Sequence, residues 1–259
     1  MALDEAVSRF AAYVKGFDQP DPDDQSHIDL KREHTLRVLQ EAQGIIASLD
    51  LDSHQAVLVE LAALFHDIGR FPQFARFGTF QDRQSVNHGL MGYQVLRKED
   101  LLPPMPWVEK KRILLTVLMH NRARLVPGLP SDLERMLRIV RDADKLDVIR
   151  VLIKHFDPRQ PHNAVVTLGL PHDPARYSPA ALEQVRSRRM VRYEQMHWLN
   201  DFKLLLLSWT YDLNFRHTRL EFLNREYVPR LAKTLPGTQE VDAVKGQVVQ
   251  DLSEGMTEA

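Results

Sequence analysis

Cysteine is absent from this chain of 259 residues. Its absence excludes disulfides, zinc–thiolate sites, iron–sulfur clusters and thiol nucleophiles. The chain does contain 11 histidines and 35 aspartate and glutamate residues. Imidazole and carboxylate are therefore the good metal ligands that remain. They favour hard or borderline divalent metals such as Mn, Fe, Mg, Ni and Zn.

The chain also lacks an excess of charge of either sign, because 34 basic and 35 acidic residues leave a formal net charge of −1. It therefore has no basic footprint for nucleic acid or an anionic membrane, although a local basic pocket is compatible. Long apolar runs are missing too, since the stretches 56–65 and 204–209 are too short to cross a bilayer. Residues 1–17 lack the apolar core of a signal peptide. We expect a cytoplasmic protein with no membrane partner.

Apolar residues recur with helical spacing, and no run shows the alternation of a strand. The sequence predicts a single all-α domain, with a core over about 26–155 and a C-terminal helical extension over about 156–259. The longest irregular segment is 157–177, with a short extended stretch expected at 164–168. The expected helices cover about 2–16, 28–48, 53–67, 83–98, 106–120, 131–155, 179–207, 210–234 and 239–252.

The clearest local signal is a His-Asp pair at the end of an apolar helix. His66 and Asp67 directly follow the apolar stretch 56–65, and Gly69 breaks the helix. A helix that is apolar all round is buried, so this pair should emerge into the interior or a cleft. Unpaired charge there would be costly, and a bound cation would supply the missing partner. A buried, hydrogen-bonded His–Asp pair without metal is the alternative interpretation.

Three further histidines lie on predicted helices. His34 lies near the edge of an apolar stripe that includes Leu36 and Leu39. His120 ends a helix and shares its inward face with Val117, one turn earlier. His88 precedes two glycines at positions 89 and 92, which allow a neighbouring backbone or a metal to approach closely. Taken singly, each histidine is also compatible with a satisfied core residue.

Two aspartates on the helix predicted over 131–155 are candidates for a carboxylate ligand. Asp142 interrupts an apolar stripe that includes Leu146, and Asp144 lies on a second stripe that includes Val148. Periodicity therefore cannot choose between them. A structural salt bridge with a nearby lysine or arginine is the alternative role for either carboxylate.

The order of these residues resembles the H…HD…D pattern of the HD superfamily of metal-dependent phosphohydrolases, over about residues 26–155. The resemblance implies an all-α HD-domain helical bundle with a metal held by His34, His66, Asp67 and the later aspartate. Members place that last ligand after a basic or apolar pair, which favours Asp142.

A subset of the superfamily adds two histidines between the HD pair and the last aspartate, and holds two metals. His88 and His120 match that longer pattern in order and approximate spacing. The resemblance then implies two divalent metals per chain, with Asp67 bridging to a second metal held by His88 and His120.

The resemblance further implies hydrolysis of a phosphoester, a nucleotide or a small phosphomonoester, by a metal-activated hydroxide. Arg70 and then Lys145 are the expected anion clamps, and with Asp67 they form the predicted catalytic set. Structural ion pairs are the alternative for both cations. Glu33 and Asp82 are candidates for carboxylates that orient the imidazoles. A homo-oligomer is compatible with the sequence.

The resemblance to the HD superfamily is also compatible with two other functions. Some superfamily members with the six-ligand pattern are mixed-valence di-iron oxygenases, and others are non-catalytic modules that sense nucleotides. The ligands alone cannot separate these classes, and hydrolysis is favoured as the commoner activity of the fold. The phenylalanines and arginines of 70–85 suit either a wall for a ring-shaped substrate or a plug for the core.

Overall fold

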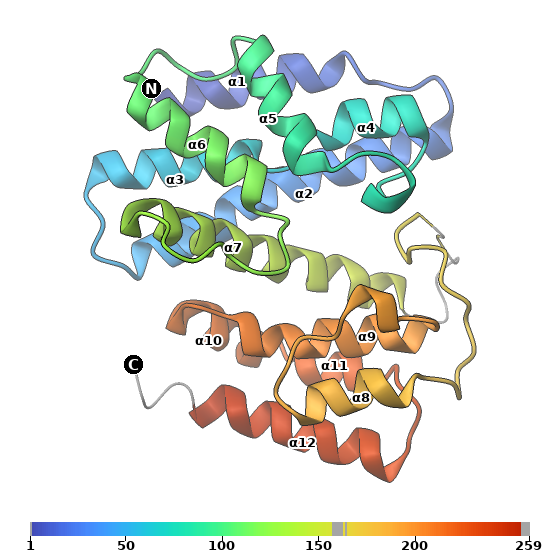
Figure 1. Cartoon of the computed structure of the whole chain (residues 1–259). Coiled ribbons are helices and arrows are strands. Elements are labelled where there is room, and N and C mark those ends of the chain that lie inside the picture. The colour runs from blue at the N-terminus through green and yellow to red at the C-terminus, as the bar shows by residue number, and fades with distance from the viewer. Residues whose placement is uncertain (1, 157–162, 164, 255–259) are drawn as a thin grey trace. The chain divides into compact units, whose positions relative to one another are not determined.

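The structure is a computed structural model that describes residues 2–156, 163 and 165–254. These residues form helices, turns and loops with no strand among them, which confirms the all-α prediction (Figure 1). The chain divides into two compact units, Met1–Asp147 and Val148–Ala259. Within the described residues, no helix combines the length and the apolar character needed to cross a membrane.

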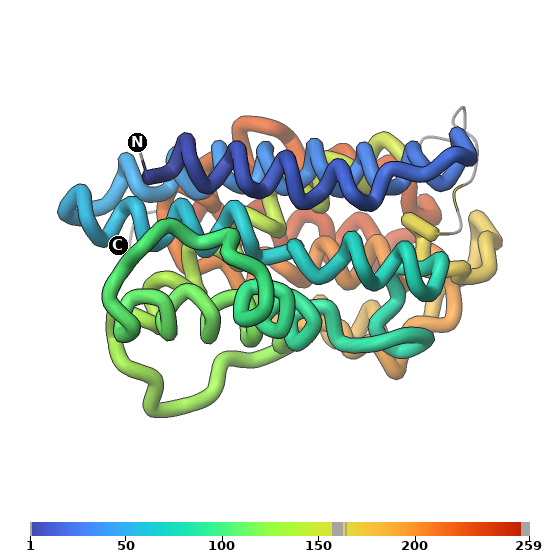
Figure 2. The backbone as a smooth tube through the Cα atoms, turned by 90° about the horizontal axis from the view of Figure 1, so that it is seen from above, coloured from blue at the N-terminus to red at the C-terminus, as the bar shows by residue number. Residues whose placement is uncertain are grey.

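The N-terminal unit holds all the predicted site residues. Seen from above, α1 and α2 run in opposite directions (Figure 2). The last helix, α7, begins in this unit and ends in the C-terminal one. The helices of the unit are α1 (Ala2–Lys15), α2 (Pro22–Ala47), α3 (Ser53–Phe65), α4 (Arg70–Phe77), the 3₁₀ turn η1 (Asp82–Gln84), α5 (His88–Lys98), α6 (Trp107–Met119) and α7 (Ser131–His155).

The apolar helix α3 lies in the core of this unit, as its sequence predicts. It packs against α1, α2 and α6, and its residues from Leu61 to Phe65 are fully buried. Phe10 of α1 contacts the rings of Phe65 and Phe71 edge-on, with centroids 6.4 and 5.9 Å apart. Because the helix is surrounded by apolar side chains, the residues that follow its last turn enter the interior.

Some helix boundaries differ from the prediction for local reasons. Helix α2 begins at Pro22 rather than near residue 28, because the carboxylate of Asp21 accepts hydrogen bonds from the N–H groups of Asp23 and Asp24. Residues 70–77 form α4, a helix that the sequence analysis did not predict. The described residues 165–168 form turns rather than the expected extended stretch, and residue 164 lies outside the described part.

The C-terminal unit contains shorter helices than predicted. The expected helix over 179–207 is divided because the buried carboxylate of Asp201 accepts hydrogen bonds from Ser178, His197 and Trp198, which fixes a loop before α9. The helices are α8 (Pro179–Arg186), η2 (Tyr193–Gln195), α9 (Leu199–Ser208), η3 (Trp209–Asp212), α10 (Arg216–Asn224), α11 (Tyr227–Ala232) and α12 (Gln239–Glu254).

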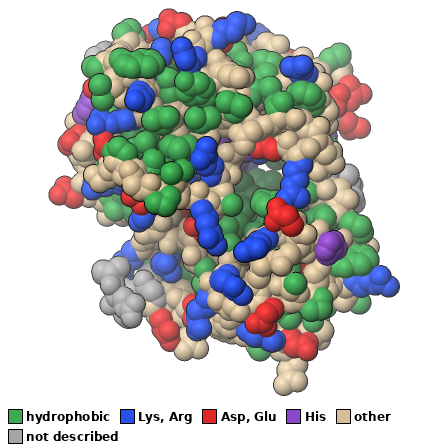
Figure 3. All heavy atoms as spheres, viewed as in Figure 1, with side chains coloured by type: hydrophobic (Ala, Val, Ile, Leu, Met, Phe, Trp, Pro, Cys, Tyr) green, Lys and Arg blue, Asp and Glu red, His purple; other side chains and the backbone are tan. Residues whose placement is uncertain are grey.

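Some apolar side chains of the N-terminal unit reach the surface. Figure 3 shows hydrophobic side chains over the region of α5 and α6. The large exposed ones there are Leu90, Trp107 and Val108. Single exposed apolar side chains are usual on folded proteins. None of the three is a predicted site residue.

Candidate metal centre

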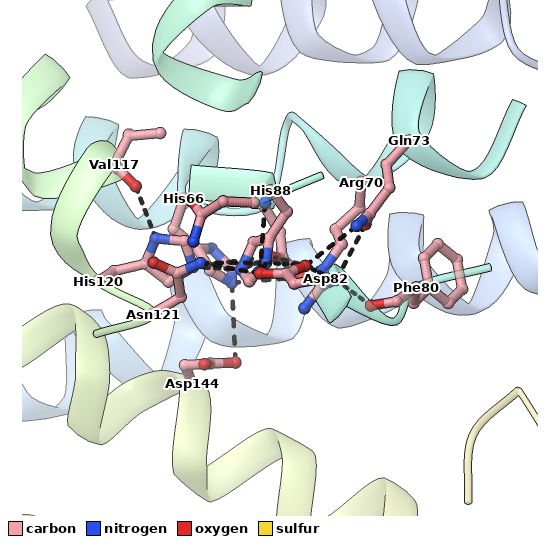
Figure 4. A network of polar contacts seen from close by, with 12 residues as sticks. His66, Arg70, Gln73, Phe80, Asp82, His88, Val117, His120, Asn121 and Asp144 are labelled. Carbon is pink, nitrogen blue, oxygen red and sulfur yellow. Dashed lines mark hydrogen bonds and ion pairs between the residues drawn. The ribbon is translucent and has the colours of Figure 1, made fainter. Parts of the chain in front are cut away.

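Two of the predicted histidines lie at the C-terminal ends of helices. His66 caps α3 and His120 caps α6, and both side chains are buried. The Nδ1–H of each ring donates to the carbonyl three residues earlier, that of Ala63 at 2.7 Å and that of Val117 at 2.8 Å (Figure 4). A proton held on Nδ1 leaves the Nε2 lone pair of each ring available to a metal.

The other two histidines are oriented by carboxylates. His34 of α2 donates from Nδ1 to Asp147 at 2.7 Å, and Asp147 also accepts two hydrogen bonds from Arg37. His88, the first residue of α5, donates from Nδ1 to Asp82 at 2.8 Å. Carboxylates in this position fix the ring and make its other nitrogen a better ligand.

Asp82 is therefore placed as the sequence predicted, and Glu33 is not. The side chain of Glu33 is exposed and pairs with Arg37 at 2.9 Å. The carboxylate that orients His34 is Asp147, which the sequence analysis did not single out. It lies 113 residues further along the chain, beyond the reach of any local pattern.

Asp67 lies between the four Nε2 atoms. Its Oδ2 is 3.5 Å from His34 and 3.8 Å from His66. Its Oδ1 is 3.4 Å from His88 and 3.7 Å from His120. The two oxygens of one carboxylate thus face two different pairs of imidazoles.

These nitrogen atoms fit a cation. The Nε2 atoms of His34 and His66 are buried and have no hydrogen-bond partner among the described residues. The Nε2 atoms of His88 and His120 face each other at 3.1 Å, although both rings carry their proton on Nδ1. Lone pairs that converge in this way repel one another unless a positive charge lies between them. Nitrogen and oxygen donors suit a divalent transition metal.

Asp144, and not Asp142, completes this arrangement. Its Oδ1 is 3.2 Å from Nε2 of His34 and 3.8 Å from that of His66, and Figure 4 shows it reaching the site from α7. Of the two groups of described side chains that could hold a metal, one joins Asp144 to these two histidines, and the other joins His66 to Asp67 and His120. Positions 142 and 144 lie about 200° apart around a helix, so both carboxylates cannot face the same imidazoles. The structure thus brings Asp144, rather than the predicted Asp142, next to His34 and His66.

The structure adds a cation that the sequence analysis missed. Lys31 lies one turn before His34 on α2, and its Nζ is 2.7 Å from Oδ2 of Asp67. Burial alone would raise the pKa of Asp67, but the charges of Lys31, His66 and Arg70 hold it well below its ordinary value. The i−3 spacing from His34 places Lys31 on the same helix face, which is the one sequence signal that pointed to it.

The two predicted clamps are placed differently. Arg70 is at the centre, with Nε 3.4 Å from Oδ1 of Asp67, and its Nη1 donates to Asp82 and to the carbonyl of Phe80. Lys145 is buried and already has a bonding partner. It lies about 100° around α7 from Asp144, so it shares no face with that carboxylate.

Close backbone packing brings the HD pair against α5. A Cβ at Gly69 would lie 2.3 Å from the carbonyl oxygen of His88 and 2.5 Å from the nitrogen of Gly92. A Cβ at Gly89 would lie 2.9 Å from the carbonyl oxygen of Leu118. These glycines therefore allow α5 to approach both neighbours, so that His88 reaches Asp67.

The aromatic segment 70–85 fills the core with some of its side chains and borders the candidate metal centre with another. Phe71 and Phe74 are buried and fill the core. Phe80 is half-buried, and its ring centroid is 5.5 Å from Nζ of Lys31 and 5.9 Å from the guanidinium carbon of Arg70. Phe80 therefore forms a wall beside the metal centre.

His34 holds a proton when no metal neutralises its surroundings. Burial and the charge of Lys31 lower its pKa, but the neighbouring carboxylates of Asp144, Asp147 and Asp67 outweigh them and raise it to about 10. Burial and the charge of Arg70 instead lower the pKa of His88 to about 3, despite Asp82. A metal that uses His34 must therefore displace a proton near neutral pH, and one that uses His88 need not.

We expect the affinity of the metal-free protein for Mn²⁺ to rise with pH, because deprotonated His34 is the form that binds. The gain should be about tenfold per pH unit for each proton displaced. Calorimetric titrations at pH 6.5, 7.5 and 8.5, in buffers of different ionisation enthalpy, measure both the affinity and the protons released. An affinity that stays constant over this range would contradict the prediction.

One comparison with known proteins matches the part of the chain that contains this centre. Residues 32–149 match the family model of the HD domain, and the chain therefore contains an HD domain over these residues. HD domains belong to a superfamily of metal-dependent hydrolases and bind divalent metals. No match was found among curated proteins or among solved structures.

Proposed function

We propose that this chain is a metal-dependent phosphohydrolase that acts on a phosphate ester of a small molecule, a nucleotide or a phosphomonoester. The observation that supports it is the convergence of four imidazole nitrogens on the two oxygens of Asp67. One divalent ion would be held by His34, His66, Asp67 and Asp144, and a second by Asp67, His88 and His120. Two groups within this set have ligand atoms close enough to share a metal, His34 with His66 and Asp144, and His66 with Asp67 and His120.

The charge of the proposed site favours an anionic substrate. Two divalent ions bring four positive charges, and the carboxylates of Asp67 and Asp144 return two negative ones. Lys31 and Arg70 add further positive charge beside Asp67. A phosphoryl group would therefore be drawn to the centre by its charge.

When bound, the metal ions would polarise a phosphoryl oxygen and lower the pKa of the attacking water. The chain's own residues supply the geometry. The Nδ1 hydrogen bonds hold the four imidazoles in one orientation, and Arg70 is held beside Asp67 by Asp82 and the Phe80 carbonyl. Hydrolysis adds water to phosphorus, breaks the P–O ester bond and returns a proton to the leaving alcohol.

The test is turnover by metal-free protein reloaded with Mn²⁺, Fe²⁺, Mg²⁺, Ni²⁺ or Zn²⁺ on a panel of nucleotides and phosphomonoesters. Release of inorganic phosphate, lost on chelation and restored by metal, is the expected result. Oxygen uptake coupled to product formation by the iron-loaded protein would instead identify a di-iron oxygenase. Full metal loading with neither activity would identify a binding module.

The second metal can be tested separately through His88. Wild-type protein should bind two equivalents of Mn²⁺ per chain, and His88→Ala should bind one, because the first site keeps its own ligands. The exposed histidine at position 54, which pairs with Glu109, provides the control variant His54→Ala. Elemental analysis and calorimetry give the stoichiometry. A single equivalent in both wild type and His88→Ala would refute the second site.

A further inference from the structure

Lys31 is a cation held at the edge of the metal centre. Its Nζ is 2.7 Å from Oδ2 of Asp67, the oxygen that also faces His34 and His66. Its side chain is 16% exposed, so it is mostly covered but not fully buried. Lys31 therefore stands where a group approaching the centre would meet it.

The ammonium of Lys31 has more N–H donors than it uses in hydrogen bonds to the described residues. It carries three N–H groups. Asp67 is its one hydrogen-bond acceptor among the described residues, and the ring of Phe80 lies 5.5 Å away. The guanidinium of Arg70 differs, because its Nη1 already donates to Gln73, Phe80 and Asp82.

We propose that Lys31 binds an oxygen of the tetrahedral anion at this centre, a phosphoryl group of the substrate, a role that rests on the proposed phosphohydrolase function. A carboxylate oxygen has two lone pairs, so Asp67 can keep the ammonium in place while it also serves as a ligand. The two N–H groups that Asp67 does not use remain available beside the oxygen that faces His34 and His66. Lysine acts as a point charge toward phosphate and needs no planar geometry.

The position of Lys31 predicts that its ammonium has opposite effects on the affinities for a metal ion and for an oxyanion. The ammonium lies near the oxygen that would bind the first metal, so its positive charge opposes metal binding. Its N–H groups favour an oxyanion. A lysine with a purely structural role would change both affinities in the same direction, through a general loss of order in the site.

The experiment measures Mn²⁺ binding to the metal-free protein and then inorganic phosphate binding to the Mn²⁺-loaded protein, both by calorimetry. Lys31→Met should bind Mn²⁺ as tightly as wild type or more tightly, with the same stoichiometry. Its phosphate affinity should fall about tenfold or more, as expected for a lost charge-assisted hydrogen bond. Lys31→Arg should recover part of that affinity, and the exposed control Lys98→Met should match wild type.

Equal phosphate affinity in Lys31→Met and wild type would overturn the role of Lys31 and leave the proposed function standing. Parallel losses of Mn²⁺ and phosphate affinity in Lys31→Met would also overturn it, in favour of a structural role. Failure of Mn²⁺-loaded wild type to bind phosphate would overturn both proposals. The three results are distinguishable within one set of titrations.

Discussion

Asp144→Asn should weaken Mn²⁺ binding at the first site by at least about 100-fold, the upper range for loss of a partner that only orients a ligand. The amide keeps the size of the side chain but removes the negative charge that lies 3.2 Å from Nε2 of His34. The proposed phosphoester hydrolysis should fall by at least the same factor when Mn²⁺ is limiting. Calorimetry and steady-state kinetics over a range of Mn²⁺ concentrations measure the two effects.

The matched control is Asp142→Asn, which changes the neighbouring buried carboxylate in the same way. It should leave the stoichiometry and affinity for Mn²⁺ unchanged, whatever it does to thermal stability, because position 142 lies about 200° around the helix from Asp144, the carboxylate beside His34 and His66. If Asp142→Asn lost the metal and Asp144→Asn kept it, the sequence-based prediction of Asp142 would be right, and Asp144 would not be the ligand on α7.

Gly69→Ala should destabilise the metal-free protein by about 3 kcal/mol or more, because the added methyl group meets two backbone atoms rather than a flexible side chain. Those atoms are the carbonyl oxygen of His88, at 2.3 Å, and the nitrogen of Gly92, at 2.5 Å. Relief of the clash must move α5 away from the HD pair. We therefore expect loss of the second Mn²⁺ equivalent as well as earlier unfolding in urea.

Gly246→Ala provides a control on α12, where an added Cβ has nothing within 4 Å. This change should stabilise its helix by up to about 1 kcal/mol, the difference in helix propensity between the two residues. Gly92→Ala should fall between the two, since its closest contact is a side-chain atom of Val117 at 2.9 Å. Equal unfolding curves for Gly69→Ala and wild type would show that α5 does not need this close approach.

The local sequence pattern was sufficient to predict the burial of several residues of the candidate site. The apolar stretch 56–65 predicted a buried helix that delivers His66 and Asp67 to the interior, and both are buried at its end. The inward position of His120 followed from Val117 on the same helix face, and both side chains are buried. Each of these features depends on residues that lie close together in the chain, so it can be predicted from the sequence alone.

The stripe used to place His34 shows where local pattern becomes unreliable. Leu36 was expected to face the core with Leu39, but it is 37% exposed, whereas Thr35 is fully buried. His34 is nevertheless buried beside Thr35. Its predicted burial was therefore right, although the predicted apolar stripe wrongly included Leu36. A polar residue on a buried face interrupts the apolar periodicity that is used to predict which face of a helix is buried.

The residue pattern along the chain thus predicted an all-α fold, the HD pair and the order of the histidines, because each depends on burial and spacing within a helix. The choice of Asp144 over Asp142 needed the tertiary structure, since α7 is buried around most of its circumference near these positions. The same holds for Asp147, which orients His34, and for Lys31, which binds Asp67. Each gains its role from a partner more than 30 residues away, and only the packing of the helices brings such partners together.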